Sequence, residues 1–203
     1  GASRAMGTAR SLHKPFYLYL SHYAIHVPLE PDHRFYQKYK DQGLPESEAR
    51  YASMIEGMDK SLDDILNYVD EKGIADNTII IFMSDNGGLS AQARAGKPHT
   101  HNAPLNSGKG SAYEGGIREP MLVRWPGVTK AGSSCNQYII IEDFFPTILS
   151  LANVKAAKKV QHVDGISFTG LLKNPQTKRS SRNLYWHFPN NWGPAGPGIG
   201  ATS

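Results

Sequence analysis

The feature that most constrains this chain is a short apolar run that ends abruptly in polar and glycine residues. Residues 77–83 (NTIIIFM) are rich in β-branched side chains, and the run is too short for a core helix. Such runs are typical of strands buried on both faces of a parallel sheet. Residues 84–88 (SDNGG) follow directly, at the carboxyl end of the strand, where ligands bind in open α/β sheets. The run therefore predicts an α/β fold with a site at the strand end.

A long amphipathic helix is predicted ahead of this strand. Between Pro45 and Gly73, apolar side chains recur every three or four residues, the spacing of one helix face. These side chains are Tyr51, Met54, Ile55, Met58, Leu62, Ile65, Leu66 and Val69. Pro45 suits the first turn of a helix, and Gly73 suits its end. Glu46 and Arg50, one turn apart, are expected to pair weakly on the solvent side.

Shorter patterns extend the α/β organisation on both sides of the helix. The aromatic and aliphatic residues 16–20 predict a buried strand, and two prolines in residues 21–32 predict a loop. The order strand, helix, strand favours a right-handed crossover connection. Residues 121–125 form a third apolar run. A further helix is predicted from Asp143, whose carboxylate would cap free amides, through Leu151.

Length and composition exclude several classes of protein. The 203 residues, 39% of them apolar, are enough to bury one sizeable core. The net charge is +4, but basic and acidic residues alternate along the chain, so we expect no nucleic-acid partner. The single cysteine excludes an internal disulfide. No apolar run is long enough to span a membrane.

Four residues carry the chemistry that this fold would present. Asp85 and Asn86 offer hard oxygen donors, which favour Ca²⁺ or Mg²⁺ over zinc, although the same residues also suit a plain turn. Lys109 lies between two glycines that allow an anion to approach, but many solvated loop lysines have glycine neighbours. His26 follows the first predicted strand and is either a general acid or a hydrogen-bonded structural residue.

The order of the motifs resembles a known family. The strings FYLYLSHYAIHVPLEP, MDKSLDDIL, NTIIIFMSDNGG, GKGSAYEGGIREPMLVRWPG and IIIEDFFPTILSLA resemble the type I sulfatases of the alkaline phosphatase superfamily, arylsulfatases and N-acetylhexosamine sulfatases among them. The resemblance implies an alkaline phosphatase-like sandwich, with a mostly parallel central sheet flanked by helices and truncated at both ends. It assigns residues 14–187 to the C-terminal part of the catalytic domain. Residues 1–13 are then a poorly defined N-terminal segment, and residues 188–203 lead to a missing or incomplete C-terminal subdomain.

The same resemblance implies roles for the four candidate residues. Asp85 and Asn86 are expected to be two ligands of a metal ion, Ca²⁺ in most such enzymes, with Mg²⁺ as the second choice. Lys109 is expected to bind the sulfate group. His26 is expected to protonate the leaving alcohol or to hold a sulfate oxygen.

Six further residues receive other expected roles. Glu114, Arg118 and Glu119 are interpreted as scaffold residues that fix the loop carrying Lys109. Substrate contacts are predicted for His99, His101 and His187, because a polar rim suits the first two better than a zinc site does.

The chain departs from the family in the nucleophile. Sulfatases of this type carry a C/S-x-P-S-R motif whose first residue is oxidised to formylglycine, and no such string occurs in these residues. The chain alone is therefore expected to be inactive. The implied partners are a sulfated carbohydrate or aryl sulfate substrate and a formylglycine-generating or equivalent maturation enzyme. The implied location is extracytoplasmic.

Two alternatives stay open. A phosphatase or phosphonate hydrolase of the same superfamily is one, although these relatives commonly place His where this chain has Asn86. A non-catalytic sulfated-glycan binding protein is the other, motivated by the missing nucleophile and by the aromatic residues 185–188.

Overall fold

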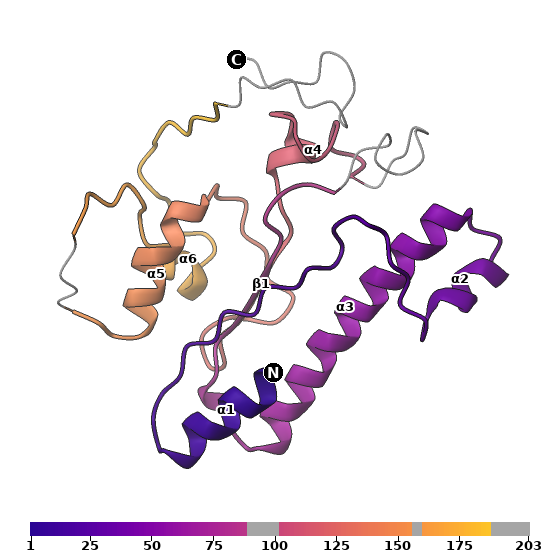
Figure 1. Ribbon diagram of the computed structural model, residues 1–203. Coiled ribbons are helices and arrows are strands. Elements are labelled where there is room, and N and C mark those ends of the chain that lie inside the picture. The colour runs from indigo at the N-terminus through magenta and orange to yellow at the C-terminus, as the bar shows by residue number, and fades with distance from the viewer. Residues whose placement is uncertain (89–101, 156–159, 188–203) are drawn as a thin grey trace. The chain divides into compact units, whose positions relative to one another are not determined.

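The computed structural model describes residues 1–88, 102–155 and 160–187, which belong to two compact units (Figure 1). Unit 1 contains Gly1–Ala75 and Ser84–Pro120, together with Trp186 and His187. Unit 2 contains Asp76–Met83 and Met121–Tyr185.

Unit 1 is built on the predicted long helix. Helix α3 (Glu46–Glu71) begins after Pro45 and ends before Gly73, which has a positive φ of 62°, so both expected boundaries are confirmed. Its buried face includes Ala49, Tyr51, Met54 and Val69. Glu46 and Arg50 pair as predicted, at 2.8 Å between Oε1 and Nε.

Two further helices pack against α3 (Figure 1). Helix α2 (Tyr36–Asp41) precedes it in the chain, and helix α1 (Ala2–Ser11) lies in a segment for which no element was predicted from the sequence. Met6 of α1 is buried, and Gly7 approaches the Tyr68 hydroxyl so closely that a Cβ there would lie 3.1 Å from it. Packing against α3 thus stabilises a helix whose own sequence gives little sign of it.

The sheet in unit 2 differs from the expected one. Strands β1 (Ile80–Met83) and β2 (Met121–Arg124) pair antiparallel, with Ile80 opposite Arg124 and Met83 opposite Met121. Within the described residues these two strands are the whole sheet, so a parallel central sheet is not confirmed. Of the predicted strand, Asn77 is the last residue of the 3₁₀ turn η1 (Ala75–Asn77), and β1 itself begins only at Ile80. All of β1 is half-buried rather than covered on both faces.

The prediction of a buried strand at residues 16–20 is wrong. This segment is extended, but no described strand pairs with it, and it runs between α1 and α2 as a coil (Figure 1). Tyr17 and Tyr19 are 69% and 78% exposed. A strand is buried on both faces only when other elements flank it, and in the described residues these flanking elements are lacking.

The remaining helices of unit 2 pack around a small core. Helix α5 (Phe144–Leu151) follows the 3₁₀ turn η3 (Ile141–Asp143), and helix α6 (Thr169–Lys173) packs against α5. The ring of Phe144 meets the buried ring of Phe168 edge-on, with 5.2 Å between their centroids. The predicted helix through Leu151 is therefore confirmed.

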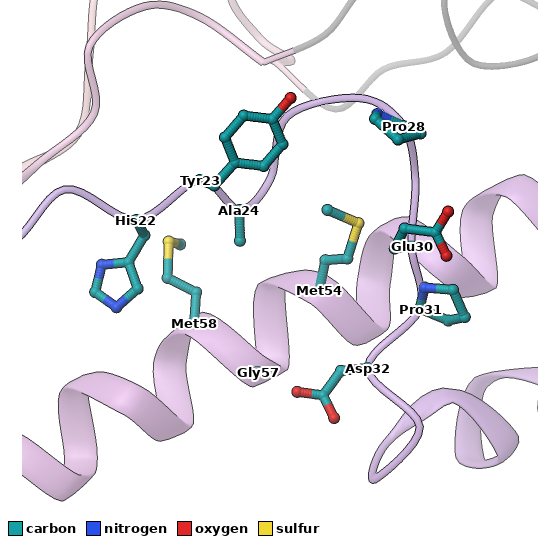
Figure 2. A pocket seen from close by; sticks show the side chains of 10 residues that line it. All are labelled: His22, Tyr23, Ala24, Pro28, Glu30, Pro31, Asp32, Met54, Gly57 and Met58. Atoms are coloured by element: carbon teal, nitrogen blue, oxygen red, sulfur yellow. The ribbon is translucent and has the colours of Figure 1, made fainter. Parts of the chain in front are cut away.

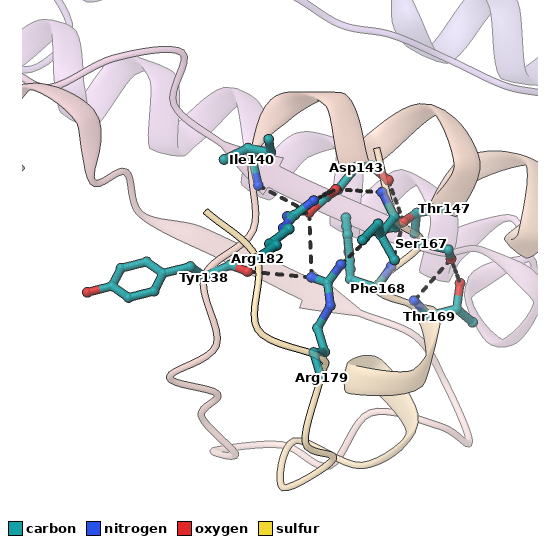
Figure 3. Close-up of polar contacts among 10 residues, drawn as sticks. Tyr138, Ile140, Asp143, Thr147, Ser167, Phe168, Thr169, Arg179 and Arg182 are labelled. Atoms are coloured by element: carbon teal, nitrogen blue, oxygen red, sulfur yellow. Dashed lines mark hydrogen bonds and ion pairs between the residues drawn. The ribbon is translucent and has the colours of Figure 1, made fainter. Parts of the chain in front are cut away.

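The predicted cap of α5 by Asp143 is wrong. The fully buried carboxylate makes no cap bond to α5 and instead accepts hydrogen bonds from Arg182, at 2.8 Å from Nη1 to Oδ1, and from the Ile166 N–H at 2.7 Å (Figure 3). Arg179 lies 3.5 Å from the other carboxylate oxygen. A buried charge needs opposite charge and several donors, and the two arginines outcompete the helix amides for it.

None of the helices in the described part of the chain combines the length and the apolar character that crossing a lipid bilayer requires.

Candidate functional site

The turn after β1, residues 84–88, holds the two predicted metal ligands and is called here the acidic turn. The Ser84 hydroxyl donates to the Asn86 carbonyl at 2.9 Å, and the Asn86 side-chain amide donates to the Gly87 carbonyl at 3.3 Å. With its nitrogen so engaged, the Asn86 amide offers its oxygen as the donor atom for a cation. Asp85 is exposed beside it.

Backbone hydrogen bonds join the acidic turn to residues 107–111, called here the lysine loop. The Lys109 N–H donates to the Gly88 carbonyl at 3.0 Å, and the Gly87 N–H donates to the carbonyl of Gly116, a few residues beyond the loop, at 3.0 Å. Gly87 is buried, and any Cβ at this position would overlap the Gly115 carbonyl oxygen. Glycine is required there because two backbones meet without space for a side chain. The structure thus brings the segments of Asp85, Asn86 and Lys109 together.

A short helix follows the lysine loop, and an ion pair joins two of the residues that were interpreted as scaffold. Helix α4 (Glu114–Ile117) follows the loop, and Arg118 pairs with Glu114 at 3.0 Å. Both side chains are largely exposed, so the pair contributes at most about 1 kcal/mol to stability.

The carboxyl group of Glu119 lies close enough to the acidic turn for the charge of Asp85 to act on its pKa. One of its oxygens, Oε1, is buried and has no hydrogen-bond partner. Burial raises the pKa of Glu119 to about 7, and the nearby charge of Asp85 adds to the rise. Sequence reasoning treated Glu119 as scaffold, because no local pattern distinguishes it from any other surface glutamate.

The donors of the acidic turn fit a hard divalent cation. A carboxylate and an amide oxygen are donor groups that Ca²⁺ and Mg²⁺ prefer. Within the described residues no group of three or more His, Cys, Asp or Glu side chains could hold a metal ion. Asp85 and Asn86 would therefore supply only part of a coordination shell, and their role as metal ligands stays a prediction.

His26 lies on a separate segment, residues 22–32, called here the histidine loop. Its Nδ1 lies 2.8 Å from the Val27 carbonyl oxygen, which also accepts the Tyr23 hydroxyl at 2.9 Å. Because a carbonyl can only accept, Nδ1 carries the hydrogen and Nε2 is the ring atom available for chemistry. The Tyr23 and His26 ring centroids are 5.4 Å apart.

The histidine loop is attached to α3 along its length. The Ser53 hydroxyl accepts the Asp32 N–H at 3.1 Å, Arg50 donates to the Leu29 carbonyl at 3.3 Å, and His22 Nε2 lies 2.9 Å from the Ser61 hydroxyl. Loop and helix line an open pocket of about 350 Å³ (Figure 2). It is lined by His22, Tyr23, Ala24, Pro28, Glu30, Pro31, Asp32, Met54, Gly57 and Met58.

The three predicted substrate contacts gain no support from the geometry. His99 and His101 lie outside the described residues. His187 is exposed at the end of the described chain, and its role stays a prediction.

Comparisons with known proteins agree with one another. The family model described as "Sulfatase" matches residues 2–154. A sulfatase of Formosa agariphila is 35% identical over 86% of this chain and 33% of its own length. Mouse arylsulfatase J is 34% identical over 75% of this chain and 24% of its own.

A solved structure is similar to this chain in fold as well as in sequence. The crystal structure of Ps i-CgsB in complex with k-i-k-neocarrahexaose matches with a TM-score of 0.74 and 31% identity, over 86% of this chain and 38% of that one. The chain spans about a third of the length of the Formosa agariphila sulfatase and about a quarter of the length of mouse arylsulfatase J.

Proposed function

The chain belongs to the sulfatase family, and we propose that it is the metal- and sulfate-binding part of an enzyme that hydrolyses sulfate esters. One observation carries the proposal. The acidic turn and the lysine loop are hydrogen-bonded to each other through Gly88 and Lys109, so the proposed cation ligands and the cationic residue lie on two directly bonded segments. A sulfuryl group in transfer is stabilised by fixed positive charge, which a bound cation and the Lys109 ammonium would both provide.

The proposed mechanism gives each residue of this chain a separate task. Asp85 and Asn86 would hold the cation, Ca²⁺ by preference and Mg²⁺ as the alternative, and such an ion would supply positive charge against the sulfate oxygens. The Lys109 ammonium binds another sulfate oxygen as a point charge. His26, with Nδ1 bound to the Val27 carbonyl, delivers a proton from Nε2 to the departing alcohol oxygen.

The nucleophile is proposed to lie beyond these 203 residues. The C/S-x-P-S-R string is absent from the chain, and the chain matches only 33% of the length of the Formosa agariphila relative. The large exposure of Tyr17 and Tyr19 supports burial by a further part of the polypeptide. The chain alone is then inactive. A formylglycine-generating or equivalent enzyme is the maturation partner, and an extracytoplasmic location goes with this proposal.

We propose a sulfated carbohydrate or an aryl sulfate as substrate. The named relatives include an arylsulfatase, and the similar crystal structure holds a neocarrahexaose. The phosphatase, phosphonate hydrolase and glycan-binding alternatives gain no support from these comparisons.

The proposal is tested by substituting Lys109 in the complete natural polypeptide that contains this chain. Sulfate release from 4-nitrophenyl sulfate and from sulfated oligosaccharides is measured in the presence of Ca²⁺. Lys109→Ala is expected to lower kcat/KM about 10²- to 10³-fold, because one fixed charge on the transition state is lost. Lys130→Ala, an exposed loop lysine, serves as the control and should stay within about twofold of the parent. Near-normal activity of Lys109→Ala would contradict the assigned role. A parent that hydrolyses 4-nitrophenyl phosphate but not 4-nitrophenyl sulfate would contradict the reaction.

A further inference from the structure

We propose that Asn102 is a positioning residue that fixes Lys109 relative to the acidic turn, an inference that rests on the function proposed above. The Asn102 side chain makes three hydrogen bonds across the two segments. Its Oδ1 accepts the Gly88 N–H at 3.0 Å, and its Nδ2 donates to the Gly88 carbonyl at 3.1 Å and to the Ser107 carbonyl at 3.1 Å. One amide therefore holds the end of the acidic turn and the start of the lysine loop.

The glycines around Asn102 leave space for this amide and for little else. A Cβ on Gly88 would lie 2.7 Å from Asn102 Oδ1, and a Cβ on Gly108 would lie 2.8 Å from Nδ2. Real Cβ contacts are not so short, so a side chain at either position would push the amide out. Gly108 directly precedes Lys109, and the Gly88 carbonyl also accepts the Lys109 N–H. Asn102 thus sets the backbone position of Lys109 from two sides.

The three bonds require the chemistry of an amide. Asparagine offers an acceptor and two donor hydrogens on one rigid plane. Aspartate has the same shape, but its second oxygen would face the carbonyl oxygens of Gly88 and Ser107 and repel them. Leucine has a similar volume and makes none of the bonds, which would leave polar groups of both segments unpaired. A lone asparagine between a histidine and an alanine gives no sequence signal of this role.

The test uses Asn102→Asp and Asn102→Leu in the complete natural polypeptide, with Asn106→Asp and Asn106→Leu as matched controls. Asn106 lies in the same stretch of chain, and its side chain is exposed. Both Asn102 variants are expected to lower kcat for sulfate ester hydrolysis about 100-fold. The reason is that a displaced Lys109 ammonium no longer binds the sulfate oxygens in the transition state. Both Asn106 variants are expected to stay within about twofold of the parent.

A double-mutant cycle separates positioning from a general loss of structure. If Asn102 acts through Lys109, the Asn102→Leu change lowers kcat far less in a Lys109→Ala background than in the parent. Full additivity of the two losses would overturn the inference, as would Asn102 variants that are as active as the Asn106 controls.

Failure of the proposed function is distinguishable from failure of this inference. A parent polypeptide that releases no sulfate overturns the function. The bridge, meaning the three hydrogen bonds of the Asn102 side chain to Gly88 and Ser107, is then tested by amide hydrogen exchange. Faster exchange of the Gly88 and Lys109 amides in Asn102→Leu, but not in Asn106→Leu, supports the bridge, and unchanged exchange in both overturns it.

Discussion

The orientation of a single ring decides what His26 can contribute. The Val27 carbonyl occupies Nδ1, so only Nε2 can carry a proton to a leaving group. We predict that His26→Ala, in the complete polypeptide, lowers kcat about 10²- to 10⁴-fold for sulfate esters of ordinary sugar alcohols. The loss for 4-nitrophenyl sulfate should be much smaller, because a nitrophenolate leaves without a proton. The two substrates are compared by steady-state kinetics.

The control for His26 is His33→Ala, an exposed histidine just beyond the same loop, which should leave both rates near the parent values. Equal losses for the two substrates in His26→Ala would refute proton delivery. They would point instead to the second role expected from the sequence, in which the ring holds a sulfate oxygen.

At the scale of elements, unit 2 depends on one buried carboxylate. Burial by itself would raise the pKa of Asp143, but hydrogen bonds from Arg182 and from the Ile166 and Ile140 N–H groups outweigh it, and the pKa lies below its ordinary value (Figure 3). Asp143→Asn leaves two arginines without their charge partner. We predict that it lowers the free energy of opening of α5 by about 3 kcal/mol, measured by amide hydrogen exchange.

The same carboxylate sets an acid limit on unit 2. Because the folded pKa of Asp143 is the lower one, its contribution is complete above the unfolded pKa and is lost as pH falls through the folded pKa. Protection of the α5 amides should therefore fall with acid in the parent and less steeply in Asp143→Asn. Asp164→Asn, whose side chain is 80% exposed, is the matched control and should follow the parent. An identical acid profile in Asp143→Asn would argue against the carboxylate as the titrating group.

These elements also show where sequence reasoning succeeds. Helix α3 was predictable from end to end, because its periodicity, its proline and its glycine are all local. The order of Asp85, Asn86 and Lys109 was predictable as a motif. The pairing of Asp143 with Arg182 was not predictable, because the two residues are 39 positions apart. The hydrogen bonds of Asn102 to Gly88 were not predictable either, because these residues are 14 positions apart. Side-chain contacts between residues far apart in the sequence depend on the tertiary fold, which a local sequence pattern does not predict.

Across the whole molecule, large apolar side chains are exposed in both units. Tyr17 and Tyr19 of unit 1 and Leu122, Phe145 and Tyr185 of unit 2 are each at least half exposed, and the buried apolar residues of the described chain are few. The residues 16–20 that were expected inside a sheet are the plainest case. A globular protein of this length buries such residues, so their exposure fits a chain that packs against further protein.

We therefore predict that the 203-residue chain, produced alone, binds the dye ANS strongly and has weak near-ultraviolet circular dichroism. The complete polypeptide should bind far less dye, because its further residues are expected to cover the apolar side chains of both units. Helix α3 should persist in the isolated chain, since α1 and α2 already pack against it, and far-ultraviolet dichroism would report it. A single cooperative urea transition of the isolated chain, with the steep slope of a well-packed protein of about 200 residues, would contradict the prediction and would mean that these residues form a complete core of their own.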